Sequence, residues 1–157
     1  MEVKYARMEL PKSIFLAGPT PRPPKGGGEK EPSWRPEAIS LLRELGFEGT
    51  VFVPEDADGS PRFDYDDQVE WELQALNSAT VVVFWIPRTE SMPAFTTNVE
   101  YGMFISKPNT VVGAPPTAEK MKYLERLAAV YGKEVYPDLK TTLAVAIAKS
   151  EGWTKTS

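Results

Sequence analysis

The sequence contains no cysteine and no histidine. The missing cysteine excludes disulfide bonds and thiolate nucleophiles, and it is typical of proteins from a reducing compartment. The missing histidine excludes imidazole metal ligands, Ser-His triads and histidine general bases. Any nucleophilic or acid–base chemistry must therefore use the side chains of Asp, Glu, Lys, Tyr, Ser or Thr.

The chain also lacks long apolar runs and an excess of positive charge. No apolar run approaches the roughly 18 residues that a membrane-spanning helix needs, and Met1 to Tyr5 lacks the apolar core of a signal peptide. The net charge is −4, from 18 basic and 22 acidic side chains, whereas proteins that bind a nucleic-acid backbone are usually basic. We therefore expect a cytoplasmic protein that acts on neither membranes nor nucleic-acid polymers.

Apolar runs of strand length alternate with amphipathic stretches of helix length. The chain has no internal repeat or linker, so residues 1–157 are expected to form a single domain. The expected strands are Ser13–Ala17, Val51–Val53, Thr80–Ile86, Thr110–Gly113 and Val135–Tyr136, after a short strand or arm at Val3–Leu10. The expected helices are Ser33–Leu45, Tyr65–Ala79, a third from Ala94 to about Ser106, Ala118–Tyr131, and a last one from Pro137 or Asp138 to Ser150. This alternation predicts an open, mostly parallel α/β sheet with helices on both faces.

The loop from Gly18 to Ser33 follows the first expected strand and is rich in proline and glycine. It could be a polyproline ligand, a phosphate-binding loop or a mobile active-site loop. The Lys-Ser/Thr ending of a P-loop is missing, and so is the Gly-x-x-Gly spacing that a dinucleotide fingerprint would need after Gly18. Because long loops in compact domains are often functional, we favour the active-site loop, ordering over a bound ligand.

Glu100 lies at the start of the third expected helix, behind the capping residues Thr96, Thr97 and Asn98. This predicts a first-turn position, in which backbone N–H groups and the helix dipole favour an ionised carboxylate. Apolar residues surround it on a helical wheel, which predicts that this helix is buried on more than one side. Glu100 is therefore either an ordinary first-turn charge or a reactive group in a pocket.

The second expected helix carries another unusually placed acid. Its apolar stripe is predicted to contain Tyr65, Val69, Leu73 and Leu76. Glu72 lies at the edge of that stripe, as a boundary residue or as a functional acid. Trp71 points to the opposite face and is therefore expected at a subunit contact.

Several fragments in register resemble the nucleoside 2-deoxyribosyltransferase-like family. They are Phe15-Leu16-Ala17-Gly18-Pro19, then Trp71-Glu72 with Leu76, then Phe84-Trp85-Ile86-Pro87-Arg88, and finally Thr96-Thr97-Asn98-Val99-Glu100-Tyr101-Gly102. The last fragment is most similar to the branch with Thr-Thr-Asn before the catalytic glutamate. The similarity spans about residues 13 to 125. It implies a flavodoxin-like, Rossmann-like three-layer fold and cleavage of N-glycosidic bonds in nucleosides or nucleotides, with exchange of the nucleobase.

The resemblance also implies roles for individual residues. Glu100 matches the nucleophile, and Glu72 matches the acid that contacts the nucleobase and relays a proton to it. Gly18 matches the tight turn under the sugar, and Asn98 lies where the catalytic segment approaches the sugar. The remaining candidates for substrate binding are Phe15, Gln68, Trp85 and Arg88, and Arg22, Lys25 and Arg88 are candidate partners of a 5′-phosphate.

This chemistry fits a protein without histidine. Breaking a C1′–N bond passes through an oxocarbenium-like state, which one carboxylate can capture while a second carboxyl protonates the leaving base. It requires no cofactor and no metal. The family's habit of building sites at subunit contacts implies a homo-oligomer, at least a dimer.

Three positions depart from the family pattern. Phe15 stands where many members have a tyrosine that hydrogen-bonds the nucleophile, Thr80 replaces a frequent aspartate, and Ala94 falls near an aspartate that some transferases use to hold the sugar. Two functions therefore remain as alternatives to a transferase: an N-glycoside hydrolase and a nucleotide-binding module without turnover.

Overall fold

A computed structural model describes residues 11–55 and 64–152 of the chain. The strand or arm expected at Val3–Leu10 lies outside the described residues.

Five parallel strands form one sheet, as expected. They are β1 (Ser13–Ala17), β2 (Thr50–Phe52), β3 (Val81–Trp85), β4 (Thr110–Gly113) and β5 (Val135–Tyr136). Their order is β2-β1-β3-β4-β5, and every neighbouring pair is parallel. Parallel neighbours require a crossover connection, and each crossover here contains one helix.

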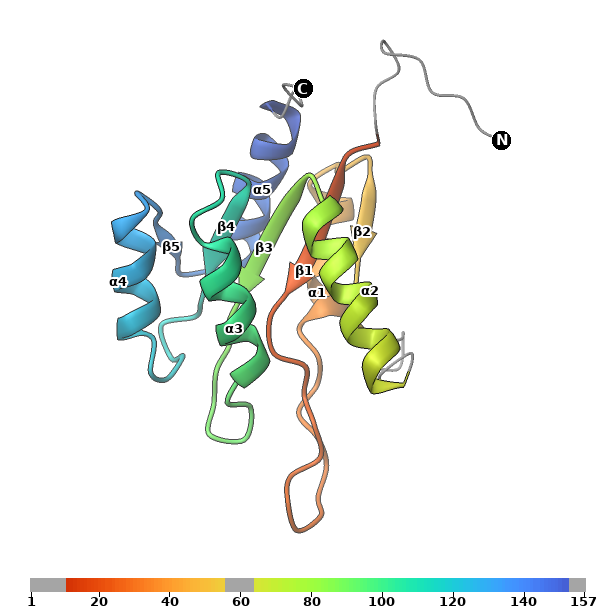
Figure 1. Cartoon of the computed structure of the whole chain (residues 1–157), viewed down its shortest axis with the longest axis vertical. Coiled ribbons are helices and arrows are strands. Elements are labelled where there is room, and N and C mark those ends of the chain that lie inside the picture. The colour runs from red at the N-terminus through yellow and green to blue at the C-terminus, as the bar shows by residue number, and fades with distance from the viewer. Residues whose placement is uncertain (1–10, 56–63, 153–157) are drawn as a thin grey trace.

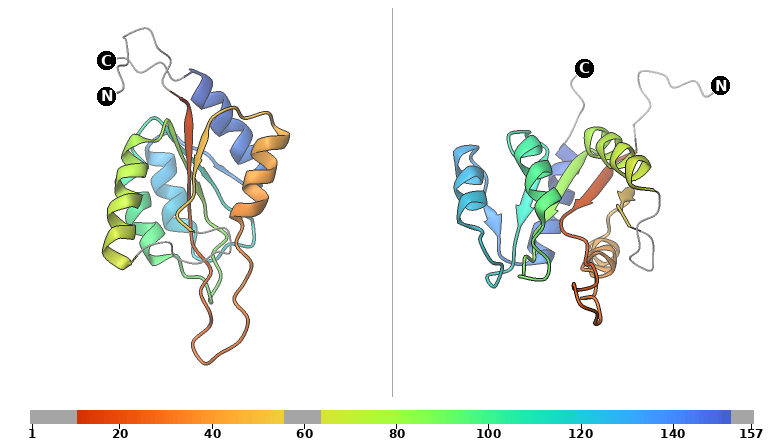
Figure 2. Two further views of the ribbon diagram at one scale, coloured as in Figure 1. Left: turned by 90° about the vertical axis from the view of Figure 1, so that its right-hand side faces the viewer. Right: turned by 60° about the horizontal axis from the view of Figure 1, so that its bottom comes forward.

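The helices cover both faces of the sheet, which gives the three layers of a flavodoxin-like fold (Figures 1 and 2). They are α1 (Arg35–Glu44), α2 (Tyr65–Ser78), α3 (Phe95–Phe104), α4 (Lys122–Val130) and α5 (Leu139–Gly152). One apolar core lies between the sheet and α2, α3 and α4, and a second lies between the sheet and α1 and α5. All five residues of β3 are buried, as expected for a parallel strand covered on both faces.

Helix α2 is rotated relative to the predicted orientation. Of the predicted apolar stripe only Leu76 is buried, whereas Tyr65 is 78% exposed and Val69 and Leu73 are each 38% exposed. Trp71 does not point outward: it is half-buried and packs against the rings of Phe15 and Phe52, with centroids 6.3 Å away in both cases. The prediction failed because the apolar periodicity of α2 belongs to the face that the chain leaves exposed. Since Trp71 packs inside the chain, it no longer supports a subunit contact.

Helix α3 is buried on one side only in this chain. Tyr101 and Phe104 face the sheet, but Val99 is 65% exposed and Met103 is 50% exposed. The sequence had predicted that this helix is buried on more than one side. The apolar residues of α3 therefore exceed what a single chain covers, and α3 lies on the same side of the sheet as α2 (Figure 2).

The strand order reverses direction between β1 and β3, because the chain adds β2 on one side of β1 and β3 on the other. Open parallel sheets bind ligands beyond the carboxyl ends of the strands at such a point. The long loop after β1 extends from this edge, at the bottom of Figure 1. Within the described residues, no helix is both long and apolar enough to cross a membrane.

Candidate active site

Glu100 and Glu72 come from two neighbouring helices and meet at the carboxyl edge of the sheet. Both side chains are half-buried, and a hydrogen bond joins their carboxyl groups. Burial is the main reason that the pKa of Glu100 is raised, to about 7, and the negative charge of Glu72 and the hydrogen bond between the two groups add to it. The positive charge of Arg35 acts in the opposite direction. Near neutral pH, the pair therefore holds a proton that two separate carboxylates would have lost.

Glu100 does not lie in the first turn of its helix, as the sequence had predicted. Helix α3 begins at Phe95, and Ala94 enters it in a left-handed conformation, with φ 60° and no side-chain cap. Glu100 is therefore the sixth residue, beyond the free N–H groups of the first turn. This explains why its pKa is raised by burial and not lowered by the helix terminus.

Gln68 lies one turn before Glu72 on α2 and orients it. The Gln68 amide nitrogen donates to Glu72 Oε1 at 2.8 Å and lies 3.4 Å from the Pro54 carbonyl oxygen, after β2. The amide therefore links the acid to the loop that leaves the neighbouring strand.

Gly18 forms the turn at the end of β1, and no other residue fits there. Its φ is 152°, and a Cβ atom would lie 2.2 Å from the carbonyl oxygen of Trp85 and 2.9 Å from the Trp34 ring. Because the first contact is with backbone, a small shift of a side chain would not relieve it.

The two aromatic candidates of the central strands lie on opposite faces of the sheet. Phe15 belongs to the core under α2, α3 and α4, where its ring contacts Trp71. Trp85 belongs to the core under α1 and α5. Its side chain therefore faces away from the core to which α2 and α3 belong, and only its carbonyl oxygen approaches the Gly18 turn.

Asn98 and Arg88 form a separate group. An Arg88 terminal nitrogen donates to Asn98 Oδ1, and the other lies 3.4 Å from the Lys120 carbonyl oxygen. Arg88 is buried, its Nε has no hydrogen-bond partner among the described residues, and burial lowers its pKa. Asn98 lies two residues before Glu100, about 200° away around the helix, so the structure does not bring this group together with the two acids.

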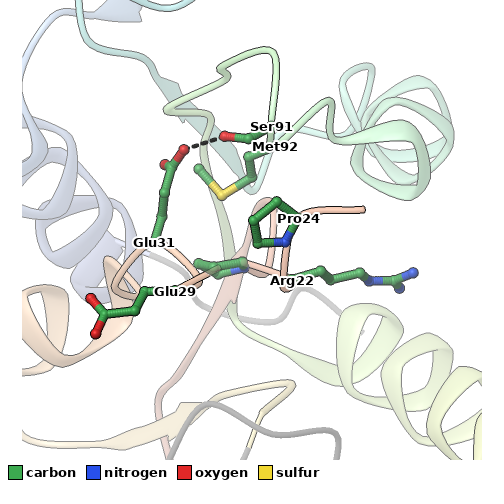
Figure 3. Close-up of a pocket in the computed structure, with 7 residues that line it drawn as sticks. Arg22, Pro24, Glu29, Glu31, Ser91 and Met92 are labelled. Atoms are coloured by element: carbon green, nitrogen blue, oxygen red, sulfur yellow. Dashed lines mark hydrogen bonds between the residues drawn. The ribbon is translucent and has the colours of Figure 1, made fainter. Parts of the chain in front are cut away.

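A contact between two loops lies close to Arg88 and Asn98. Glu31, near the end of the long loop, accepts hydrogen bonds from Thr89 Oγ1, at 3.2 Å, and from Ser91 Oγ (Figure 3). Arg22 extends away from this contact in Figure 3, and Lys25 is also exposed. Two hollows border the contact, of about 120 and 300 Å³, and the larger is lined in part by Arg88, Trp34 and Thr117. Neither hollow includes Glu72 or Glu100 in its lining.

Sequence reasoning missed the buried Arg35. Its guanidinium forms an ion pair with Glu55, which follows β2, at 3.1 Å, and both side chains are almost fully buried. It also donates to the Gly18 carbonyl oxygen at 2.8 Å. One signal could have found it: a cation in the first turn of a helix is opposed by the helix dipole, so it needs another reason to be there.

Glu100, Glu72, Gln68 and the Gly18 turn thus converge where the strand order reverses, together with Arg35. A profile of the family described as "Nucleoside 2-deoxyribosyltransferase like" matches residues 11–118. No curated protein gives a significant match. The profile covers more than half of the chain and confirms the resemblance found in the sequence. The chain therefore belongs to the nucleoside 2-deoxyribosyltransferase-like family, which indicates glycosyl transfer on nucleosides.

Proposed function

We propose that this chain cleaves the N-glycosidic bond of a 2′-deoxynucleoside or its nucleotide and transfers the sugar to another nucleobase. The observation that carries the proposal is the hydrogen-bonded pair of Glu100 and Glu72 at the carboxyl edge of the sheet. Two carboxyl groups in contact can share a proton, so a protein without histidine can use one of them as a nucleophile and the other as an acid.

In the first step, a Glu100 carboxylate oxygen bonds to C1′ of the sugar. The C1′–N bond breaks, and its electron pair goes to the base nitrogen, which takes a proton from Glu72 directly or through another atom of the base. In the second step, a nitrogen of the acceptor base attacks C1′ and displaces Glu100, and the Glu72 carboxylate takes the proton that this base loses. With water as the acceptor the same steps amount to hydrolysis.

The hydrogen bond between the two acids allows them to share one proton. With one proton on the pair, the productive state has it on Glu72, leaving Glu100 ionised. The positive charge of Arg35 acts on both acids, so it favours the presence of one ionised carboxylate in the pair. Gln68 donates to Glu72 Oε1, so it fixes the orientation of the acid toward the leaving base.

The other candidates receive roles that follow from their positions. The Gly18 turn forms the floor under the sugar, since no side chain can intrude there, and the Trp85 carbonyl supports it from below. Phe15 presents an aromatic ring beneath the acids without the hydroxyl group of a tyrosine. Arg88 and Asn98 lie on the other side of α3, and we assign them to the far end of the substrate, where a 5′-phosphate would be.

A base-exchange assay tests the proposal. The protein is incubated with a panel of 2′-deoxynucleosides and their 5′-monophosphates, with and without a second nucleobase, and free base and exchanged nucleoside are separated by chromatography. Exchanged nucleoside is the expected result. Release of base without exchange would identify a hydrolase, and binding without either product would identify a module without turnover.

A further inference from the structure

The dipeptide Trp34-Arg35 holds the backbone that follows β1. Near the end of a strand and beyond it, carbonyl groups lose their ladder partners and need others. Arg35 Nε donates to the Leu16 carbonyl oxygen at 3.1 Å, an Arg35 terminal nitrogen donates to that of Gly18 at 2.8 Å, and Trp34 Nε1 donates to that of Pro19 at 3.1 Å. The other terminal nitrogen of Arg35 donates to Thr20 Oγ1 at 2.9 Å. The chain from the end of β1 into the long loop is thus fixed from α1.

Arg35 interacts with two further carboxyl groups besides the one in its ion pair. Glu55 lies 3.1 Å from its guanidinium, and the charges of Glu72 and Glu100 act on it as well. These carboxyl groups come from three different parts of the chain: Glu55 follows β2, Glu72 is on α2 and Glu100 is on α3. Burying a guanidinium without a partner is unfavourable, and Glu55 alone would balance its charge. Besides its ion pair with Glu55, the positive charge of Arg35 therefore attracts the carboxylates of Glu72 and Glu100, the two acids of the candidate active site.

We propose that Arg35 is a positioning residue of this active site: its guanidinium fixes the Gly18 turn and keeps a positive charge beside the Glu100–Glu72 pair. The inference rests on the proposed function of these two acids. Arg35 itself touches no reacting atom in this assignment, and it acts through the Gly18 carbonyl and through its charge.

The two effects of Arg35 have different consequences. Its charge stabilises ionised Glu100 against burial and against Glu72, so removal of the charge should move the ionisation of Glu100 to higher pH. Its planar fork reaches two backbone carbonyls and Glu55 at once, which an ammonium group does not reproduce. Loss of the fork should disturb the sugar site while leaving the ionisation of Glu100 close to its original pH.

Three variants separate these effects. Arg35→Met removes charge and fork, and Arg35→Lys removes the fork alone. Arg43→Met, on the exposed last turn of the same helix, is the matched control. If Arg35→Met does not fold because Glu55 is left buried without a partner, Arg35→Met combined with Glu55→Gln removes both charges and takes its place.

The ionisation of Glu100 is followed by NMR on protein labelled with carboxyl-¹³C glutamate, with the Glu100 signal identified by its loss in Glu100→Gln. The midpoint in Arg35→Met, or in the double variant, should lie about one pH unit or more above that of the wild type. Arg43→Met should not shift it. An unchanged midpoint in a folded Arg35→Met or double variant would overturn the charge effect.

Kinetics test the fork. The pH profile of kcat/KM for base release should keep its acidic limb in Arg35→Lys, whereas KM should rise about tenfold. An unchanged KM in Arg35→Lys would overturn the positioning role of the fork. If the wild type releases no base from any nucleoside, the proposed function fails, but the NMR titration still decides whether Arg35 controls the ionisation of Glu100.

Discussion

The two faces of the sheet differ in how completely the chain covers them. Helices α1 and α5 contact each other over one face, and neither exposes a large apolar side chain. On the other face, α2 and α3 leave six such side chains exposed: Tyr65, Val69, Leu73, Phe95, Val99 and Met103. Packing within the chain completes the first face, whereas the second presents an apolar surface of the kind that binds another protein.

The candidate acids belong to the incompletely covered face. Glu72 and Glu100 are on α2 and α3, and α1 contributes to their surroundings through Arg35, which reaches past the end of β1. Stability and chemistry are thus divided between the faces. The α1/α5 face provides a closed core and a fixed cation, and the α2/α3 face provides acids on helices whose outer sides remain available for a partner.

The largest expected effect is on the chemistry of the α2/α3 face. Glu100→Gln should lower base exchange and base release by about 10⁴-fold or more, because it removes the nucleophile and no cysteine or histidine can replace it. The matched control is Glu70→Gln, an exposed acid on α2, which should keep full activity. Both rates are measured with the best substrate of the panel. Retained exchange in Glu100→Gln would show that the acids are structural.

The second prediction concerns the exposed apolar side chains. We expect the protein to be a homo-oligomer, at least a dimer, joined through α2 and α3. Val99→Glu combined with Met103→Glu should raise the dissociation constant about 100-fold or more, because charges would replace apolar groups at the centre of the contact. Sedimentation or light scattering measures the mass, and a monomer has 17.5 kDa.

Val130→Glu is the control for this experiment. Val130 is 68% exposed on α4, so the same change there tests whether any exposed apolar residue behaves in this way. Dissociation caused by Val130→Glu, or a monomeric wild type at micromolar concentration, would remove α2 and α3 as the contact.

The third prediction concerns the Gly18 turn at the carboxyl end of β1. Gly18→Ala should lower the free energy of unfolding by about 1–3 kcal/mol, because the new methyl group would overlap the Trp85 carbonyl oxygen. Gly26→Ala, in the same loop, also has positive φ (112°) but nothing within 4 Å of the new atom, so it should cost less. Denaturant midpoints compare the two variants. Equal costs would mean that backbone conformation matters here and the close approach does not.

The last prediction is a dependence of stability on pH. The pKa of Glu100 is raised in the folded chain from 4.5 to about 7, so the folded state binds this proton more tightly than the unfolded state. The resulting contribution to stability is fully present below about pH 4.5 and is lost as the pH rises through 7. Relative to Glu100→Gln, the wild type should therefore become less stable between pH 5 and pH 8. Denaturant unfolding at these two pH values measures the difference, and a constant difference would contradict the raised pKa.

The prediction of strands from sequence succeeded because they are short, continuous apolar runs. Ser13–Ala17, Thr110–Gly113 and Val135–Tyr136 were predicted with their observed bounds, and the other two strands differ by one residue at each end. Parallel strands covered on both faces need apolar residues at every position, so sequence alone identifies them. The beginning of α3 was misplaced because Thr96, Thr97 and Asn98 resemble a cap, whereas the chain enters this helix through Ala94 without one.

The sequence by itself determined the alternation of strands and helices, the exclusion of histidine and cysteine chemistry, and the two acids as candidates. These properties depend on residue type and local periodicity. Tertiary structure decided the rotation of α2, the partners of Arg35 and the raised pKa of Glu100. Each of these depends on groups far apart in the chain, because burial and charge act through space and the periodicity of one helix does not show which side its neighbours cover.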